Sequence, residues 1–359
     1  MNKKLIALAV AAGVAAPMSA QAAPTLYGQL QAEISSEGRD NAANTTADGR
    51  IIQGGGGRFQ EDVGVTDNKR GRLGVKGDED LGGGLKAIYK YEWQVDTADQ
   101  STTTAGSDPI HTNGREAFVG LKGGFGQIEL GRLKSAYKYY GGVKYDPFVT
   151  TEMEARRYGG MSTGSFGHNS FLSDTLAYQG KFGMVSMRIT YNLDEQANTD
   201  GDYTAGLKFG SKAWEAGIAL AHDDNGSTAA DDAYDALKVF GKVKFGNMAV
   251  RGQYEMTEDE NGTTANGNVK QEGEILFLGF DMKFGGKTTL SIQAAQNTVE
   301  VAGAPDQEGD YVAVGVTHKF TKKTRIFAGY GAMSGDNLNN VQSDNNDRDA
   351  VTVGMRIDF

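Results

Sequence analysis

The sequence predicts an all-β protein, a transmembrane antiparallel β-barrel of about sixteen strands, a size within the range of outer-membrane barrels. Three observations predict it: side chains alternate between apolar and polar along many segments, tight turns alternate with long polar loops, and glycine is abundant. The chain has 51 glycines and 5 prolines, which favours short strands and tight turns over helices. Its 39% hydrophobic content suits a barrel, because only alternate side chains face lipid.

The first residues have the pattern of a secretory signal peptide. A basic start is followed by an apolar run from Leu5 to Ala16, and Ala20 and Ala22 form the small-x-small pattern that signal peptidase cleaves. The run is shorter than the ~20 residues of a membrane-spanning helix. The expected divisions are 1–22 (signal peptide, removed) and 23–359 (barrel domain), with Ala23 as the first mature residue.

Period-two patterning identifies the individual strands. From Leu85 to Val95 the odd-numbered side chains are apolar and, apart from Ile88, the even-numbered ones are polar. The segments 184–193 and 351–359 repeat the pattern. Helical spacing would scatter these apolar residues around an axis, so the pattern predicts strands with one lipid-facing side.

Two kinds of connection alternate along the chain. Short turns are expected at 81–84, 123–126, 182–183, 210–212, 246–247, 285–287 and 321–323. Long polar loops are expected at 37–66, 96–113, 134–170, 195–200, 223–232, 257–270, 300–309 and 334–348. Seven turns and eight loops imply about sixteen strands, with both termini on the periplasmic side.

Closure of the sheet follows from the cost of leaving backbone groups unpaired in lipid. The strand from Leu26 to Ile34 should therefore pair with the strand from Val351 to Phe359. About sixteen strands enclose a lumen too wide for side chains to fill, which predicts a water-filled channel.

Several classes of function are disfavoured. The chain has no cysteine and a net charge of −10, so disulfides, thiolate metal sites and nucleic-acid binding are not expected. The four histidines form neither a zinc-binding motif nor a nucleophile–base pair, and no G-x-S-x-G sequence occurs. We therefore expect no enzyme activity, no metal and no cofactor.

Four segments resemble the proteobacterial general porins. They are GRLGVKGDEDLGGGLKA at 71–87, REAFVGLKGGFGQIELGR at 115–132, the opening TLYGQLQAEI and the closing VGMRIDF. The resemblance implies a homotrimer of sixteen-stranded barrels in the lipid of the cell outer membrane, passing ions and small hydrophilic solutes. It also implies that the third external loop folds inward, and that Phe359 is a C-terminal assembly signal.

Carried onto this chain, the inward loop is 134–170, and charged side chains on it and on the facing wall should form the pore constriction. The candidates are Arg70, Arg72, Lys76, Arg115, Arg132, Asp146, Glu152, Glu154, Arg156 and Arg157. Strand parity also turns Lys86, Lys90 and Arg356 toward the lumen. A basic wall opposite an acidic loop would create a field across the opening that selects permeants by charge. Because the loop carries both signs of charge, the preference between anions and cations stays open.

Three functions compete. A passive, non-specific diffusion channel is the main expectation. A solute-specific outer-membrane channel would differ by showing saturable block by one solute. An adhesin or receptor barrel would bind partners through its long polar loops even when the pore is blocked.

Overall fold

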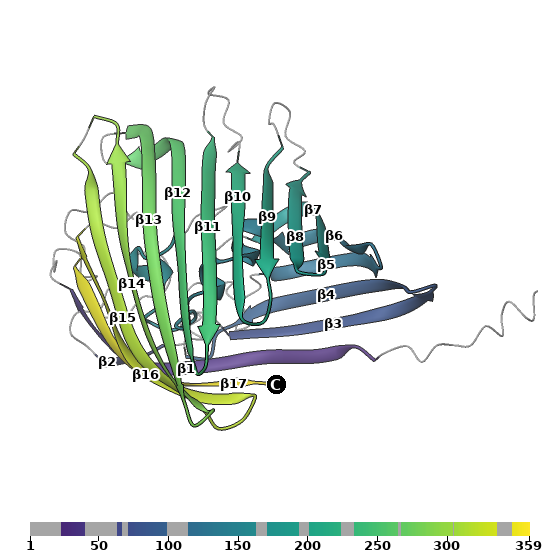
Figure 1. Ribbon diagram of the computed structural model, residues 1–359, viewed down its shortest axis with the longest axis horizontal. Helices are drawn as coiled ribbons and strands as arrows, with labels where there is room; N and C mark the ends of the chain where they lie inside the picture. Colours follow the sequence, from purple (N-terminus) through teal and green to yellow (C-terminus); the bar gives the residue numbers. More distant parts are fainter. Residues whose placement is uncertain are drawn as a thin grey trace, which may run out of the picture.

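The structure is a computed structural model that describes residues 23–39, 63–66, 71–98, 114–162, 171–193, 201–223, 233–264, 267–303, 305–335 and 347–359. Nearly all of these residues are in antiparallel strands that lie side by side in chain order (Figure 1). The first half of the sheet comprises β1 (Thr25–Arg39), β2 (Val63–Thr66), β3 (Gly71–Gly82), β4 (Leu85–Val95), β5 (Gly114–Gly123), β6 (Gly126–Lys134), β7 (Phe171–Phe182), β8 (Val185–Asn192) and β9 (Tyr203–Gly210). The second half comprises β10 (Trp214–Asp223), β11 (Tyr234–Phe245), β12 (Met248–Thr264), β13 (Gly267–Phe284), β14 (Thr288–Val301), β15 (Gln307–Lys319), β16 (Thr324–Gly335) and β17 (Arg348–Asp358).

These segments form sixteen barrel strands, as predicted. Segments β2 and β3 pair one after the other with β1, so they are two parts of one interrupted strand. On its other edge β1 pairs with β17, from Gln29 opposite Asp358 to Ser36 opposite Val351 and beyond. Figure 1 shows the purple first strand beside the yellow last one. The backbone of Phe359 completes the seam by exchanging hydrogen bonds of 3.0 and 3.1 Å with Gly28. The sheet is therefore closed.

All seven predicted turns connect neighbouring strands in the structure. Several use glycine in the left-handed region, for example Gly183 with φ of 60° and Gly246 with φ of 59°. A side chain would be strained at such a position, which explains why glycine recurs at the short turns.

One predicted loop is partly strand. We expected a polar loop at 257–270, but β12 runs to Thr264 and β13 begins at Gly267. Polar residues continue the strands there. Lys270 on β13 forms ion pairs with Glu258 and Glu260 across on β12, and with Glu272 on its own strand. These cross-strand pairs allow the ladder to extend beyond the apolar band.

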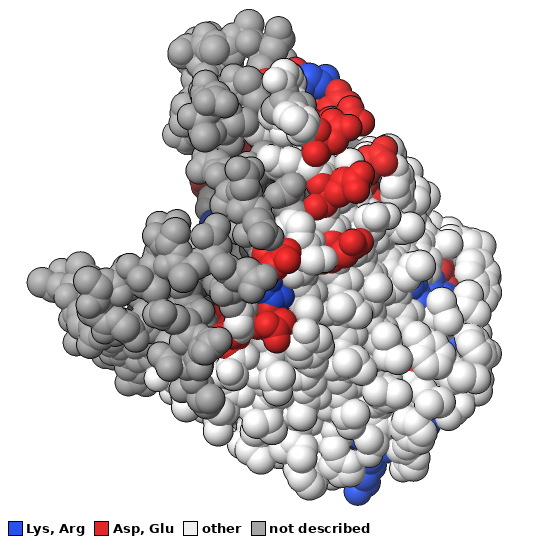
Figure 2. All heavy atoms as spheres, turned by 90° about the vertical axis from the view of Figure 1, so that its left-hand side faces the viewer, with Lys and Arg blue, Asp and Glu red and all other residues white. Residues whose placement is uncertain are grey.

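The outer face of the barrel is mainly apolar. Exposed side chains such as Ile218, Val239, Leu278, Val314 and Val353 alternate with lumen-facing residues. Figure 2 shows the result, a broad surface without charged side chains that is bordered on one side by acidic residues. In the part of the chain that the structure describes, no helix is long and apolar enough to cross a membrane.

Candidate functional site

The segment after β6 folds into the lumen, as the resemblance implied for the third external loop. Its described part, 135–162, contains α2 (Ala136–Tyr139) and the short 3₁₀ helices η2 (Gly142–Lys144) and η3 (Ala155–Tyr158). The side chain of Ser135 caps α2 by accepting a 3.0 Å hydrogen bond from Lys138 N. In Figure 1 this teal segment lies within the ring of strands.

The first half of the inward segment is fixed to β11 and β12. Tyr137 Oη donates to Glu255 at 2.8 Å, and Lys238 Nζ donates to the carbonyl of Tyr137 at 2.5 Å. Further along, Gly142 N donates to Gln253 at 2.5 Å. All of these groups are buried. Buried polar groups without partners are costly, so these contacts hold the segment against one side of the wall.

The second half is fixed to β1, β14 and β15. Tyr311 Oη donates to the carbonyl of Met153 at 2.6 Å, and Glu152 N donates to Glu33 at 3.1 Å. Thr150 has a φ of 86°, which is unfavourable for a β-branched residue. Gln31 holds it there by accepting a 2.9 Å bond from the threonine hydroxyl and donating to its carbonyl. Such backbone strain persists only where neighbouring contacts enforce it.

The acidic residues of the segment lie behind it, against the wall. Asp146, Glu152 and Glu154 are 3%, 0% and 0% exposed. Asp146 accepts 2.8 Å bonds from the backbone of Phe148 and Ala155. Burial raises its pKa to about 6, helped by repulsion from Glu154. These carboxylates therefore fasten the segment and do not face the opening.

A cavity of about 430 Å³ lies between the inward segment and the opposite wall, which is formed by β3–β7 and β17. Its charged lining residues are all basic: Arg72, Arg115, Arg132, Lys134, Lys138, Lys144, Arg156 and Arg356. The remaining described lining is Gln94, Gly114, Val143, Val149, Thr150 and Phe171. No carboxylate belongs to the described lining, so an ion in the cavity meets cations on both sides.

Carboxylates that neutralise part of this charge are set back from the cavity. Glu92 is 2% exposed and pairs with Arg115 at 2.7 Å and with Arg72 at 4.0 Å. Glu116 pairs with Lys134 at 2.7 Å. In each case the acid is buried and the base borders the opening, an arrangement that leaves cationic groups closest to a permeating ion.

Two of the basic residues have no acidic partner among the described residues. Within the described part of the chain Arg132 donates to neutral groups, the carbonyl of Gly114 at 2.9 Å and the hydroxyl of Ser173 at 2.7 Å. Burial lowers the pKa of Lys144, against an opposing effect of Glu116, and the neighbouring cation Arg72 lowers it further. The cavity therefore has a surplus of positive charge.

The expected constriction residues are distributed as follows. Arg72, Arg115, Arg132 and Arg156 line the cavity together, whereas Asp146, Glu152 and Glu154 are buried beyond it. Arg157 pairs with Glu152 and, at 3.7 Å, with Glu37. Lys76 lies to one side, with its ammonium 5.0 Å from the ring of Tyr27. Arg70, Ala20 and Ala22 lie outside the described residues, and Ala23 is exposed just before β1.

The sequence interpretation did not name Lys134, Lys138, Lys144 or Phe171 as residues of the constriction. Lys138 and Lys144 were within the expected inward loop, but a segment without regular periodicity gives no indication of which side chains face the opening. Phe171 lies opposite Lys134 in the β6–β7 pair, next to the basic cluster. In the described part of the chain, no group of three or more His, Asp or Glu side chains is arranged to hold a metal ion.

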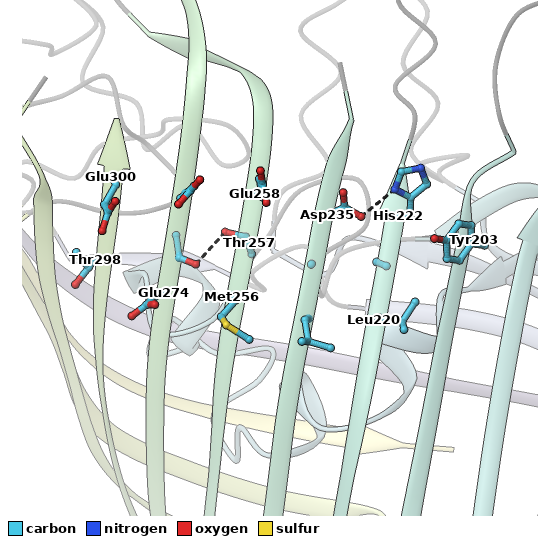
Figure 3. Close-up of a pocket in the computed structure, with 15 residues that line it drawn as sticks. Tyr203, Leu220, His222, Asp235, Met256, Thr257, Glu258, Glu274, Thr298 and Glu300 are labelled. Atoms are coloured by element: carbon cyan, nitrogen blue, oxygen red, sulfur yellow. Dashed lines mark hydrogen bonds and ion pairs between the residues drawn. The ribbon is translucent and has the colours of Figure 1, made fainter. Parts of the chain in front are cut away.

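A second hollow lies on the outer face of the barrel, toward the external ends of β9–β14. Figure 3 shows its lining, in which His222 Nδ1 and Asp235 Oδ1 lie at a hydrogen-bonding distance of 2.8 Å. Asp235, Glu258, Glu272 and Glu300 lie directly opposite one another on β11, β12, β13 and β14. We call these four residues the outer acidic row. They belong to the acidic border of the apolar surface.

Comparison with known proteins identifies the family. A model of the Gram-negative porins matches residues 7–338. The chain belongs to the Gram-negative porin family. Its barrel accordingly lies in the cell outer membrane. The short turns and both termini of the chain are on the periplasmic side.

Curated relatives of this porin include major outer membrane proteins P.IB. The protein from Neisseria meningitidis serogroup B is 41% identical over 143 residues, which is 40% of this chain and 37% of the relative. The protein from Neisseria lactamica is 30% identical over 245 residues, 67% of this chain and 65% of the relative. The matched part of this porin thus spans less than two thirds of these relatives.

Solved porins share the fold at low sequence identity. An anion-selective porin from Comamonas acidovorans has a TM-score of 0.71 and 20% identity, covering 94% of this chain and 99% of that one. OmpT of Vibrio cholerae, solved in a trimer form, has a TM-score of 0.65 and 16% identity, covering 94% and 99%.

Proposed function

We propose that this porin is a passive diffusion channel for ions and small hydrophilic solutes across the outer membrane, and that it favours anions. The observation that carries the proposal is the lumenal cavity, whose charged lining is entirely basic among the described residues. A charged ring with low-dielectric walls concentrates ions of the opposite sign. No catalytic step is part of the proposal.

The proposed pathway runs through the cavity between the inward segment and the opposite wall. Arg72, Arg115 and Arg132 attract anions from the wall side, and Lys138 and Lys144 attract them from the inward segment. The buried acids keep the segment in place without presenting charge to the permeant. The likeness to an anion-selective porin is consistent with this arrangement.

Reconstitution tests the proposal. In planar bilayers the folded porin should give stepwise, ohmic conductance. In vesicles it should pass a small organic anion faster than an organic cation of matched size. A folded porin without conductance would exclude the channel, and faster passage of the cation would exclude the anion preference.

The proposed assembly is a homotrimer formed through one part of the apolar outer face. A shallow groove along β1 and β15–β17 is lined by apolar, small and hydroxyl side chains, and it includes no charged residue. Val351, Val353 and Ile34 are more than half exposed there. We propose that the groove of each subunit is covered by a neighbouring subunit of the trimer. The trimer form of OmpT, a porin of similar fold, supports this proposal.

Substitutions on two parts of the outer face test this assembly. Val353→Trp should convert the folded porin to monomers, because the indole would prevent close packing of two sheets. Val239→Trp, on the exposed face of β11, is the matched control and should leave the oligomer intact. Mass measurement in detergent distinguishes the outcomes, and monomeric wild type or an unchanged Val353→Trp oligomer would contradict the proposal.

A further inference from the structure

One aromatic ring is surrounded by the cations of the cavity. Phe171, the first residue of β7, lines the cavity opposite Lys134. Lys138 Nζ lies 4.2 Å from the ring centroid, the Arg115 guanidinium carbon 4.9 Å and Lys134 Nζ 6.0 Å. Three separate elements, α2, β5 and β6, therefore direct a cation toward the same ring.

Cations collected in this way repel one another, and the repulsion is stronger where burial lowers the local dielectric constant. Glu92 and Glu116 stabilise Arg115 and Lys134 from behind, but each carboxylate also cancels one positive charge. An aromatic ring acts differently, because its quadrupole attracts a cation while the ring carries no net charge. It holds cations in place and leaves their charge available to the permeant.

We propose that Phe171 is a positioning residue that sets the ion selectivity of this pore. Its ring keeps Arg115, Lys134 and Lys138 together at the cavity without neutralising them. The inference rests on the proposed anion preference and deepens it, since it assigns part of that preference to an uncharged side chain. Leucine at this position would fill space but would remove the ring that the three cations share, so their charged groups would be held less closely around the cavity.

The test is the chloride-to-potassium permeability ratio, obtained from the zero-current potential of single pores in a KCl gradient. Phe171→Leu should lower the ratio about twofold to fivefold, as expected from losing cation–π contacts in a partly exposed site. Phe171→Trp should retain the wild-type ratio, because the indole face also attracts cations. Phe118→Leu is the matched control, because Phe118 pairs with Lys90 on the lumen-facing side of β5 but does not line the cavity.

Pentafluorophenylalanine at position 171 separates electrostatics from packing. It retains the shape of the ring and reverses its quadrupole, so it should lower the ratio at least as much as leucine. Opening of conducting pores shows that each variant has folded. An unchanged ratio in Phe171→Leu, or a wild-type ratio with the fluorinated ring, would overturn the inference. A wild-type pore without anion preference would instead overturn the proposed function on which the inference rests.

Discussion

The lumenal cavity and the outer acidic row lie on different arcs of the same sheet and carry opposite charge. The cavity is bordered by basic side chains from β3–β7, β17 and the inward segment, whereas the outer acidic row is formed by β11–β14. Figure 2 shows acidic side chains beside the apolar surface, and Figure 3 shows Asp235, Glu258 and Glu300 on strands that line the outer hollow. The net charge of −10 therefore does not indicate the sign of the pore.

The difference shows that the charge met by a permeating ion depends on where the acidic side chains lie more than on how many there are. In the cavity region Glu92, Glu116 and Glu154 are buried behind basic partners, so they support cations instead of opposing them. In the outer acidic row the carboxylates face outward and directly oppose one another. Reversing charge in one region should alter permeation, and reversing it in the other should not.

The largest expected effect comes from reversing Arg132 and Lys144, two cations of the cavity that have no acidic partner among the described residues. The double variant Arg132→Glu, Lys144→Glu changes the local charge by four units. At about 5 Å and a dielectric constant of about 80 this corresponds to about 3 kcal/mol for each monovalent ion, or about a hundredfold change in its local concentration, which salt screening reduces. The zero-current potential should change sign.

The matched control reverses two charges of the outer acidic row. Glu258→Lys combined with Glu272→Lys changes the same number of charge units outside the lumen. The zero-current potential should stay close to the wild-type value. An equal shift in both double variants would remove the distinction between the two regions.

The next effect is the pH dependence of Asp146. Its pKa of about 6 in the folded porin exceeds the ordinary value of 3.8, so the folded state binds this proton more tightly than the unfolded state. Stability from this group is therefore complete below pH 3.8, falls as the pH rises to about 6 and is constant above that. The loss is about 3 kcal/mol. Urea unfolding of wild type and Asp146→Asn should show this slope only in wild type, and equal slopes would contradict it.

A smaller effect is expected where the inward segment meets β12. Glu255→Ala removes the acceptor for Tyr137 Oη and for Ser162 Oγ, which lies 2.6 Å away. Leaving these buried donors unpaired should cost about 2 kcal/mol and loosen the segment. Single-channel records should show larger current fluctuations. Asp78→Ala, on β3, is the control and should leave the fluctuations unchanged, because Asp78 pairs with Lys86 on the neighbouring wall strand at 2.7 Å.

The smallest effect concerns repulsion within the outer acidic row. Glu300 lies directly opposite Glu272, and like charges at such positions destabilise a sheet. Glu300→Gln should therefore stabilise the folded porin by about 0.2–1 kcal/mol. The gain should appear as a higher unfolding midpoint at low salt and shrink at high salt. A lower midpoint at low salt would show that the row is not strained.

Much of the fold could be predicted because a barrel strand reports its two faces through alternation. The 85–95 segment and the seven glycine-rich or short turns were sufficient to count the strands, and the cost of an unpaired edge predicted the pairing of the first and last strands. The 257–270 hairpin was assigned as a loop because it is polar on both faces. The structure nevertheless continues β12 to Thr264 and begins β13 at Gly267, so strand pairing extends through a segment without alternating polarity.

The candidate site could be predicted only in part. Strand parity turns Arg72 and Arg356 toward the lumen, and in the structure both line the cavity. The inward segment lacks the two-residue period of a strand. The sequence therefore does not show which of its acidic and basic side chains face the wall and which face the opening. Tertiary contacts make that assignment: Asp146 is drawn to Gln293 in the wall at 2.9 Å, and Lys144 is left at the opening.

The anion preference of the wild-type pore is the central claim, and the zero-current potential across a tenfold KCl gradient tests it most directly. With cations on both sides of the cavity, the side of lower salt should become negative relative to the side of higher salt, because chloride crosses faster than potassium. A potential of the opposite sign, from a folded and conducting porin, would contradict the account.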